Sequence, residues 1–300
     1  MATGQQKVLL SVVGNLDDPG FHQCRLLAEA IADEFSPVSL DVRALVHTDY
    51  EDFVLAKSKE LGAAGNAEAY NHTSSPFVFY NGCNYIGGVR ELAVWARRVY
   101  DITINKDASE YEAIAKDTKA NFMQESKSSF CYIDVGLEGE EAPQRVTIEL
   151  YDDVCPKTCD NFRNLCSGKT GRSYAGSPFH RVMKDGYVQG GDIDGGRGDG
   201  GESSAGDPVP DEGFSVSHGK SGIVSMANTG AHSNKSQFFV TLKDMSWLDQ
   251  KFVAFGRVVF GMNVFKRINA LPVENQRPLQ LPRIVGGGVE EAPEVRNDMK

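Results

Sequence analysis

The sequence predicts two domains, an α/β domain followed by a mainly β domain that is closed or sandwiched. Three observations predict this order. The chain has 300 residues, more than one hydrophobic core usually serves. Residues 7–104 alternate between strand-like and helix-like periodicity, whereas short strands and glycine turns dominate after residue 128. Hydrophobic residues make up 41% of the chain and charged residues 24%, so the chain can bury cores of ordinary globular composition.

The first domain, residues 1–104, reads as strand, helix, strand, helix, hairpin and helix. Asn81-Gly82 is a typical hairpin turn, and it separates a strand ending at Tyr80 from Tyr85-Ile86. This order predicts a small mixed sheet covered by helices. The expected strands span residues 7–13, 38–46 and 76–80, and the expected helices span residues 21–35, 50–61 and 89–100.

Residues 105–127 are expected to form a connecting helix, because Asp107 and Glu110 have the spacing of a capping box before a run of helical periodicity. Residues 128–289 form the second domain, with two alternating runs as strands and two helical segments. The strands of this domain span residues 130–137 and 144–151, and its helices span residues 156–165 and 262–271.

The tail, residues 290–300, is acidic without a periodic face and is expected to be mobile.

The charge balance excludes several classes of partner. With 31 Lys and Arg against 41 Asp and Glu, the net charge is -10, so no basic surplus exists to neutralise phosphates and nucleic acid is not expected as a partner. The apolar run at residues 8–13 is too short for a signal peptide or a membrane span. We therefore expect a soluble, cytoplasmic protein without a membrane partner, whose six cysteines are free thiols.

Three further patterns are interpreted as structural. Residues 196–201 satisfy G-x-G-x-x-G, but an acidic, proline-broken segment follows instead of the helix that a dinucleotide site needs. Cys155, Cys159 and Cys166 lack a fourth ligand nearby, so no metal site is expected and buried thiols are the simpler interpretation. No role is assigned to the scattered histidines, His22, His47, His72, His218 and His232.

Arg181 and Gln189 interrupt an otherwise apolar segment, and their even spacing places both side chains on one face if that segment is extended. Two interpretations remain open: an apolar pocket with a few polar groups, or an aromatic core with a buried, paired arginine. Apolar side chains that would form either one follow in the sequence: Phe238, Phe239, Trp247, Leu248, Phe252 and Phe255.

Residues 128 to about 288 resemble a cyclophilin, the peptidyl-prolyl cis-trans isomerase family, over essentially the whole family domain. The motif CPKTCDNFRNLCSG resembles its first helix and FHRVMKDGYVQGGDI its arginine strand, while SMANTGAHSNKSQFF and WLDQKFVAFG resemble its active-site segments. The resemblance implies an eight-stranded antiparallel β-barrel capped by two helices. It also implies an external groove that takes an extended proline-containing protein segment as partner, with no cofactor.

The resemblance implies roles for individual residues. Arg181, Gln189 and Asn228 match the catalytic arginine, the glutamine and the backbone-binding asparagine of the family. In the implied mechanism the Arg181 guanidinium donates to the amide as its conjugation is lost, and Gln189 orients the guanidinium. The positions implied for substrate binding are His180, Tyr187, Gly198, Ala227, Thr229, Gln237, Phe239, Trp247, Leu248 and Phe252.

Several groove positions depart from the family pattern. Gly186 stands where a wall phenylalanine is usual, and Tyr187 replaces a methionine. Phe252 stands where histidine is usual, and Thr229 where alanine is common. These changes rebuild the proline pocket around a retained arginine. They are expected to weaken both turnover and the binding of cyclosporin-like ligands.

The N-terminal domain is similar to a thioredoxin or glutaredoxin fold over residues 6 to about 104, which implies a cis peptide bond before Pro76. Redox chemistry would need a cysteine at the start of the first helix, but Cys24 lies inside that helix. A degenerate domain that contacts a partner is therefore the preferred interpretation over an oxidoreductase. Cyclophilins with such a domain form a divergent subgroup associated with ciliated cells, which implies a ciliary or axonemal setting.

Two hypotheses for function follow. The first is a peptidyl-prolyl cis-trans isomerase, of reduced activity, acting on proline-containing protein segments. The second is a catalytically weak adaptor that uses the groove to hold proline segments and the N-terminal domain for a second contact in a larger assembly. Peptide binding without turnover would favour the adaptor.

Overall fold

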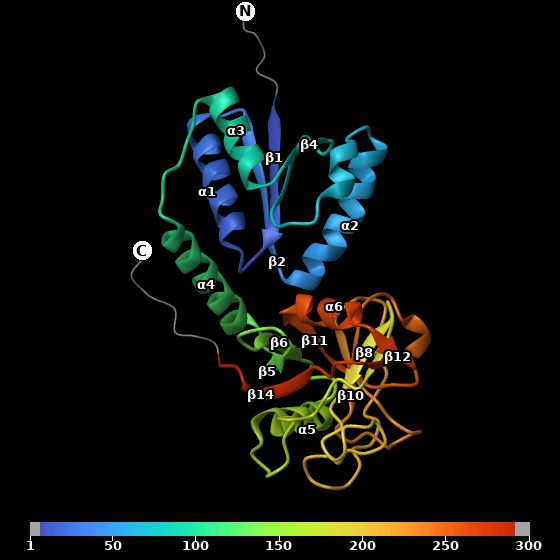
Figure 1. Ribbon diagram of the computed structural model, residues 1–300. Coiled ribbons are helices and arrows are strands. Elements are labelled where there is room, and N and C mark those ends of the chain that lie inside the picture. Colours follow the sequence, from blue (N-terminus) through green and yellow to red (C-terminus); the bar gives the residue numbers. More distant parts are fainter. Residues whose placement is uncertain (1–6, 292–300) are drawn as a thin grey trace, which may run out of the picture. The chain divides into compact units, whose positions relative to one another are not determined.

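The computed structural model describes residues 7–291, which divide after Glu125 into two compact units. The predicted order of an α/β domain and a β domain is confirmed (Figure 1). Residues 292–300, most of the predicted acidic tail, lie outside the described residues.

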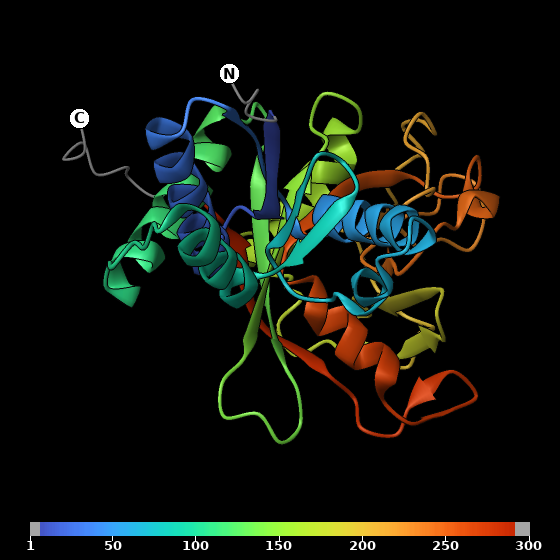
Figure 2. The same cartoon turned by 90° about the horizontal axis from the view of Figure 1, so that it is seen from above.

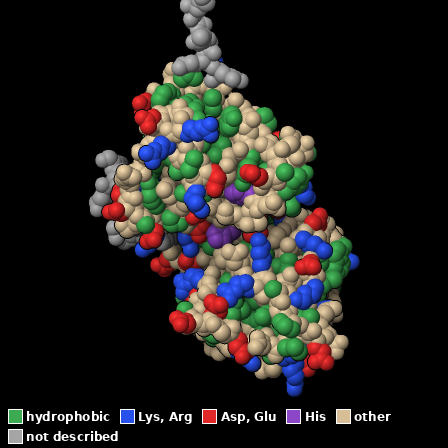
Figure 3. Space-filling model, turned by 45° about the horizontal axis from the view of Figure 1, so that its top comes forward, with side chains coloured by type: hydrophobic (Ala, Val, Ile, Leu, Met, Phe, Trp, Pro, Cys, Tyr) green, Lys and Arg blue, Asp and Glu red, His purple; other side chains and the backbone are tan. Residues whose placement is uncertain are grey.

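No helix within residues 7–291 is long and apolar enough to cross a membrane. On the face drawn in Figure 3, Lys and Arg side chains lie among Asp and Glu side chains.

The first unit contains a four-stranded sheet in the order β2-β1-β3-β4. β1 and β2 are parallel and the other neighbours are antiparallel, so the sheet is mixed as predicted. Its elements are β1 (Val8–Asn15), α1 (Pro19–Glu34), β2 (Val38–Leu45), α2 (His47–Ala63), the 3-10 helix η1 (Ala67–Asn71), β3 (Phe77–Tyr80), β4 (Asn84–Gly87), α3 (Val89–Tyr100) and α4 (Ala108–Glu125).

Strand alternation divides the core of this unit between the two faces of the sheet. Leu10 and Val12 pack with α1 and α3 on one face, while Val13 packs with α2 on the other (Figure 1). α1 begins two residues before the expected start, because Pro19 is its first residue and the Asp18 carboxylate accepts a hydrogen bond of 2.9 Å from Gly20 N. The peptide bond before Pro76 is cis, as the resemblance implied.

The helix predicted as a connection is α4, and it belongs to the first unit. It contacts α1, and it buries Tyr111 and Ala115. At its start the Glu110 carboxylate accepts a hydrogen bond from Asp107 N at 3.2 Å, which is the backbone half of the predicted capping box. α4 is therefore part of the fold of this unit.

The second unit is an antiparallel sheet of eight strands in the order β14-β5-β6-β11-β9-β10-β8-β7. A separate two-stranded hairpin, β12-β13, comes between α6 and β14 in the sequence. The elements are β5 (Phe130–Gly136), β6 (Gln144–Leu150), α5 (Pro156–Ser167), β7 (Arg181–Met183), β8 (Tyr187–Gly190), β9 (Ile223–Met226), β10 (Phe238–Thr241), the 3-10 helix η2 (Ser246–Leu248), β11 (Ala254–Phe260), α6 (Met262–Ala270), β12 (Val273–Glu274), β13 (Arg277–Pro278) and β14 (Arg283–Val289).

The segment before β7 closes this sheet into a barrel. Phe179 N donates to Pro282 O at 2.8 Å and Ile284 N donates to Ser177 O at 3.0 Å, so residues 177–179 run beside the start of β14. α5 and α6 cover opposite ends of the barrel (Figure 1), and the loop between β5 and β6 projects from it as a long hairpin (Figure 2). Phe162 of α5 packs against Phe238 and Phe255, with ring centroids 5.3 and 5.0 Å apart. The predicted eight-stranded antiparallel barrel with two helices is confirmed.

One local expectation was wrong, and one hairpin was not predicted. Arg181 and Gln189 do not lie on one extended segment: the chain turns at Asp185, which has a φ of 54°, and the two residues face each other across the β7–β8 hairpin. The β12–β13 hairpin was not expected, because each of its strands has only two residues and shows no periodicity.

Candidate functional site

The Arg181 side chain is held by a residue far away in the sequence. Its Nε donates to the Gln276 side-chain oxygen at 2.7 Å, and its guanidinium carbon lies 5.6 Å from the centre of the Tyr187 ring. The rest of the side chain is exposed. The guanidinium is therefore fixed at one nitrogen by a neutral acceptor, and its remaining N–H groups face the surface.

Gln276 reaches Arg181 because of a tight turn. Asn275 and Gln276 have φ values of 49° and 67°, which is the backbone of a two-residue hairpin turn between β12 and β13. Gln276 O also accepts a hydrogen bond from Val182 N at 2.6 Å, so main chain and side chain both bind β7. The sequence did not reveal this residue, because Asn-Gln lacks the glycine that marks such turns.

Gln189 does not orient the arginine in this structure. Its amide donates to the Gln237 side-chain oxygen at 2.9 Å, and Gln237 donates in turn to Gly200 O at 2.8 Å. These bonds tie β8 to β10 and to the glycine-rich loop. In this structure the Arg181 side chain donates its hydrogen bond to Gln276, whereas Gln189 bonds to Gln237.

The residues expected to seat a proline ring form a compact apolar cluster. Phe239 lies at its centre, with the Tyr187 ring 5.1 Å away on one side and the Phe252 ring 5.4 Å away edge-on. Phe239, Leu248 and Tyr187 are only 3%, 2% and 8% exposed. The departures at positions 187 and 252 thus cover Phe239 with aromatic rings. The interpretation as an aromatic core is right for these rings, because they are buried. It is wrong for Arg181, because the arginine lies at the surface, as the interpretation as a pocket requires.

His218, to which the sequence analysis assigned no role, packs against this cluster. Its buried ring stacks on Phe239 with centroids 5.8 Å apart. Its ring nitrogens lie 2.7 Å from Asp249 Oδ1 and 3.0 Å from Ser225 Oγ. Burial would raise the pKa of Asp249, but hydrogen bonds from His218 and Ser217 hold that pKa below its usual value. The charged Asp249 therefore anchors the segment that follows Leu248.

The remaining groove residues lie along the edge of the cluster. Asn228 donates from its side chain to Lys251 O at 3.2 Å, and Thr229 N donates to Ser233 Oγ at 3.0 Å. Ala227 N donates to Gln237 O at 2.9 Å, which continues the ladder beside β10. Trp247 is 55% exposed, and the Lys251 ammonium group lies 5.6 Å from the centre of its ring.

The glycine-rich loop after β8 is organised by one buried carboxylate. Asp192 accepts hydrogen bonds from Gly198 N at 2.7 Å and from Asp194 N at 3.1 Å. Burial would raise the pKa of Asp192, but these backbone donors lower it below its usual value. Gly198 has a φ of 96°, and a Cβ there would lie 2.7 Å from the His180 ring. No helix follows this loop, as expected.

His180 is buried against this loop. Neither of its ring nitrogens has a hydrogen-bond partner among the described residues. Burial lowers the pKa of His180, although the nearby Asp192 carboxylate opposes that shift. The ring is therefore neutral at neutral pH, with one nitrogen able to donate and the other to accept.

A surface cavity of about 580 Å³ collects the polar residues of the site. Four predicted residues line it, namely His180, Arg181, Gln189 and Gly198. Arg197 and Arg277, which the sequence did not single out, line it as well. Phe239 and Leu248 do not, so the polar and apolar halves of the predicted groove are adjacent but separate.

Comparison with known proteins agrees with this architecture. The family model for "Cyclophilin type peptidyl-prolyl cis-trans isomerase/CLD" matches residues 132–289. The chain is also 37% identical over 294 residues to the human protein "Probable inactive peptidyl-prolyl cis-trans isomerase-like 6", covering 95% of this chain and 92% of that protein. This chain belongs to the cyclophilin family.

Two more relatives show how the similarity divides along the chain. A mouse protein with the same name as the human one is 36% identical over 292 residues, which is 93% of this chain and 90% of that protein. A "Peptidyl-prolyl cis-trans isomerase" of Encephalitozoon cuniculi is 49% identical over 146 residues, which is 49% of this chain and 84% of that protein. The family match itself lies within the barrel unit.

The cysteines of this cyclophilin are free, and five of the six are buried. Cys155 and Cys159 contact the carbonyl oxygens of Ala254 and Phe255 in β11 through their sulfur atoms. Burial raises the pKa of Cys155 to about 11 and that of Cys24 to about 12. The thiols of α5 thus pack in the barrel core, and within residues 7–291 no group of three or more potential metal ligands is found.

Proposed function

We propose that the barrel unit is a slow peptidyl-prolyl cis-trans isomerase that acts on extended proline-containing protein segments. The observation that carries this proposal is the Arg181 guanidinium, which Gln276 holds at 2.7 Å beside the Tyr187–Phe239 cluster. An exposed cation beside aromatic rings is the combination that a proline ring and a twisting amide need. Membership of the cyclophilin family supports the same activity.

The chemistry requires no covalent intermediate. Rotation about an Xaa-Pro bond has an uncatalysed barrier of roughly 18–20 kcal/mol because the C–N bond has partial double-bond character. As the amide twists, the proline nitrogen regains its lone pair and conjugation with the carbonyl is lost. A free Nη–H group of Arg181 would donate to that nitrogen or to the carbonyl oxygen. Because Gln276 already holds Nε, the guanidinium is preorganised for the twisted state.

A second candidate is an adaptor that binds proline segments without turning them over. It is favoured by the Tyr187 and Phe252 rings, which cover Phe239 on two sides. The names of the human and mouse relatives describe those proteins as probably inactive isomerases. In the adaptor, the first unit would supply a second contact surface within a larger assembly.

One comparison separates the two candidates: turnover and affinity measured on the same proline peptides with the full chain. We expect the wild-type chain to isomerise a proline peptide in a protease-coupled or exchange-spectroscopy assay. Arg181→Ala is expected to lower kcat/KM by about 100-fold, the scale of about 3 kcal/mol for one preorganised donor. Peptide affinity should change much less.

Arg283→Ala is the matched control, since Arg283 is an exposed arginine of the same barrel that donates to Gly176 O at 2.7 Å outside the cavity. Binding by the wild-type chain without measurable turnover would replace the isomerase with the adaptor. Full activity of Arg181→Ala would show that the arginine is not the catalytic residue.

A further inference from the structure

The cavity beside Arg181 has an unusual charge for this acidic protein. Three guanidinium groups line it, those of Arg181, Arg197 and Arg277. They face one carboxylate in the lining, that of Glu274, and a second one directly behind Gly198, that of Asp192. The chain as a whole carries a net charge of -10. A local cationic surplus in a concave site concentrates anions there.

Two of these guanidinium groups are held by neutral oxygens. Arg181 donates through Nε to the Gln276 amide, and Arg277 donates through Nη2 to Gly196 O at 3.1 Å. Within residues 7–291 neither forms an ion pair with a carboxylate. Each guanidinium has five N–H donors, so most of these donors remain available in the cavity.

The third guanidinium is weakly engaged. Arg197 Nε lies 3.5 Å from Asp199 Oδ1, and both side chains are at least 70% exposed, so this pair contributes little. Arg197 can therefore turn toward a bound group. The wall beneath these arginines contains His180, whose buried ring nitrogens have no partner. A polar group that enters the cavity would meet donors on its rim and an unsatisfied ring at its wall.

We propose that this cavity binds an anionic side chain, a carboxylate or a phosphate monoester, of the peptide whose proline contacts the Tyr187–Phe239 cluster. The inference rests on the proposed function, and it names the substrate class: proline segments with an acidic or phosphorylated residue close to the proline. Planar guanidinium groups suit both anions because they form paired N–H···O bonds. A phosphate has roughly twice the charge of a carboxylate, so we expect the positive charge of the cavity to bind it more tightly.

The test is a titration of the full chain with matched peptides that differ at one residue. That residue is Glu, Gln, Lys or phosphoserine, placed in turn at each position from three before to three after the proline. At the favoured position we expect Glu to bind about fivefold more tightly than Gln, and Lys more weakly, as a few partly exposed charge pairs would give. The phosphoserine peptide should bind more tightly than the Glu peptide, and raising the salt concentration should reduce both preferences.

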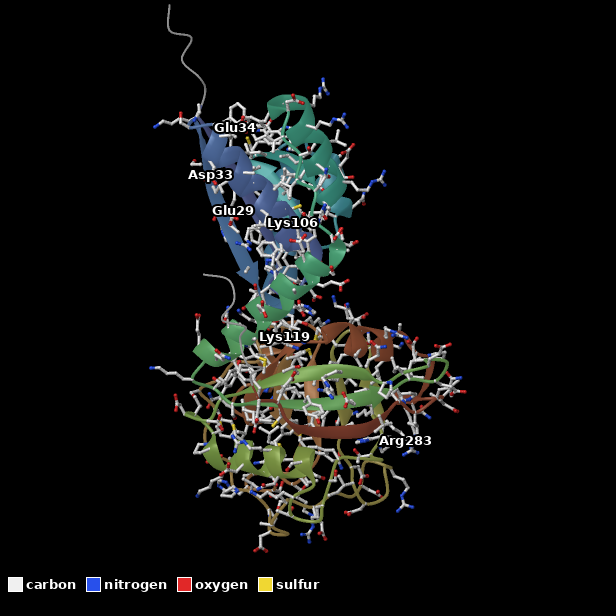
Figure 4. All side chains as sticks on the ribbon, turned by 90° about the vertical axis from the view of Figure 1, so that its left-hand side faces the viewer. Glu29, Asp33, Glu34, Lys106, Lys119 and Arg283 are labelled. Carbon is white, nitrogen blue, oxygen red and sulfur yellow. The ribbon has the colours of Figure 1, made fainter. Side chains whose placement is uncertain are left out.

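Arg277→Gln is expected to reduce the Glu-to-Gln affinity ratio toward one. Arg283→Gln is the matched control, because Arg283 also donates to a glycine carbonyl but is the first residue of β14 (Figure 4). It does not line the cavity. Its ratio should equal that of the wild type. If Arg277→Gln does not fold, the Glu, Gln and Lys series on the wild type decides the question.

The outcomes separate this inference from the function on which it rests. Binding of the Gln peptide with no preference for Glu or phosphoserine at any position overturns the acidic substrate class and leaves the proposed function in place. Absence of binding and turnover for every proline peptide overturns both. A preference for Glu that is unchanged in both Arg277→Gln and Arg197→Gln shows that the anion binds outside this cavity, which also overturns the inference.

Discussion

Tyr187 and Phe252 decide how much of Phe239 a proline ring can reach. Each ring contacts Phe239 in an aromatic pair, and such pairs are worth about 0.5–1.5 kcal/mol beyond the area that they bury. A substrate that needs the Phe239 face must first move one of these rings. An opening cost of about 1 kcal/mol reduces apparent affinity about fivefold. This cost would make the proposed isomerase slow without any change in the arginine.

Phe252→His should lower that cost, because the smaller polar ring loses most of the edge-on contact with Phe239. We expect kcat/KM to rise by about three- to tenfold, which corresponds to the loss of one aromatic pair. The protease-coupled assay measures it, with the thermal midpoint recorded to show that the variant is folded. A folded variant with an unchanged or lower rate would mean that Phe252 does not restrict access to Phe239.

Gly186→Phe, which restores the usual wall residue, is expected not to raise the rate. Tyr187 already packs against Phe239, and a Cβ at position 186 would lie 3.1 Å from Met183 Cγ and Sδ. The added ring has to displace Met183, at a cost of about 1–3 kcal/mol in the free energy of unfolding. Urea unfolding measures the cost, and a gain in kcat/KM would show that the Tyr187 ring leaves the wall incomplete.

Cys83 is expected to be the reactive thiol of the native chain. It is exposed on the turn between β3 and β4, whereas burial raises the pKa of Cys24 to about 12. Iodoacetamide at pH 7.5 should add one group to the native protein and six in guanidinium chloride, as counted by mass spectrometry. Rapid labelling of Cys24 would contradict the buried position of this thiol in α1 and would reopen a redox role for the first unit.

At the scale of elements, the Asp192 carboxylate makes more hydrogen bonds to the glycine-rich loop than any other side chain. Asp192 lies just after β8 and binds the backbone N–H groups of Asp194 and Gly198 with its two carboxylate oxygens. Gly198 of this loop packs against His180, and Arg197 of the same loop lines the cavity. A loop without regular structure is thus held in place by charge-assisted hydrogen bonds, and the cavity depends on it.

Asp192→Asn should lower the free energy of unfolding by about 2 kcal/mol at pH 7, since a neutral amide accepts these bonds less well and its NH2 group faces N–H donors. The folded pKa of Asp192 is lowered, so its contribution is complete above the usual Asp value of about 3.9 and is lost as the pH falls through the folded pKa.

Urea unfolding at pH 7 and in steps below pH 4 tests both statements. The difference between the wild type and Asp192→Asn should shrink in acid. Asp199→Asn, at a side chain that is 70% exposed, is the matched control and should change little at either pH. A difference that stays constant with pH would show that the contribution of Asp192 is not electrostatic.

At the scale of the whole molecule, the candidate site is built within one unit. Arg181, Gln276, the aromatic cluster and the cavity lining all lie within residues 126–291. The unit extends beyond the last strand, because Glu290 N donates to Phe130 O at 2.9 Å and its carboxylate accepts from Thr147 Oγ1 at 2.6 Å. These bonds tie the residue after β14 to β5 and β6.

A chain of residues 126–291 is therefore expected to fold and to keep kcat/KM on short proline peptides within about twofold of the full chain. Two-dimensional NMR spectra report folding, and the coupled assay reports activity. Ending the chain at residue 289 should lower the thermal midpoint, because the bonds from Glu290 to Phe130 and Thr147 are lost. A folded 126–291 chain with much lower activity would show that the first unit contributes to the site.

The elements of both units could be predicted from local patterns. The Asn81-Gly82 turn separates β3 from β4 as predicted, and α1 begins within two residues of its predicted start, because turns and helix starts depend on neighbouring residues. The family resemblance placed Arg181, Gln189 and Phe239 at one groove, and the structure brings Arg181 and Gln189 together across one hairpin. Local chemistry and long motifs are sufficient for these features.

Features that join distant residues required the tertiary structure. The bond from Arg181 to Gln276 spans 95 residues, and the turn that presents Gln276 has no glycine to mark it. The packing of Tyr187 and Phe252 on Phe239, and the meeting of Arg181 with Arg277, depend on which strands pair and on how side chains fill the space between them. Side-chain packing and charge are nonlocal properties, so only the closed barrel determines which residues share a pocket and which rings cover it.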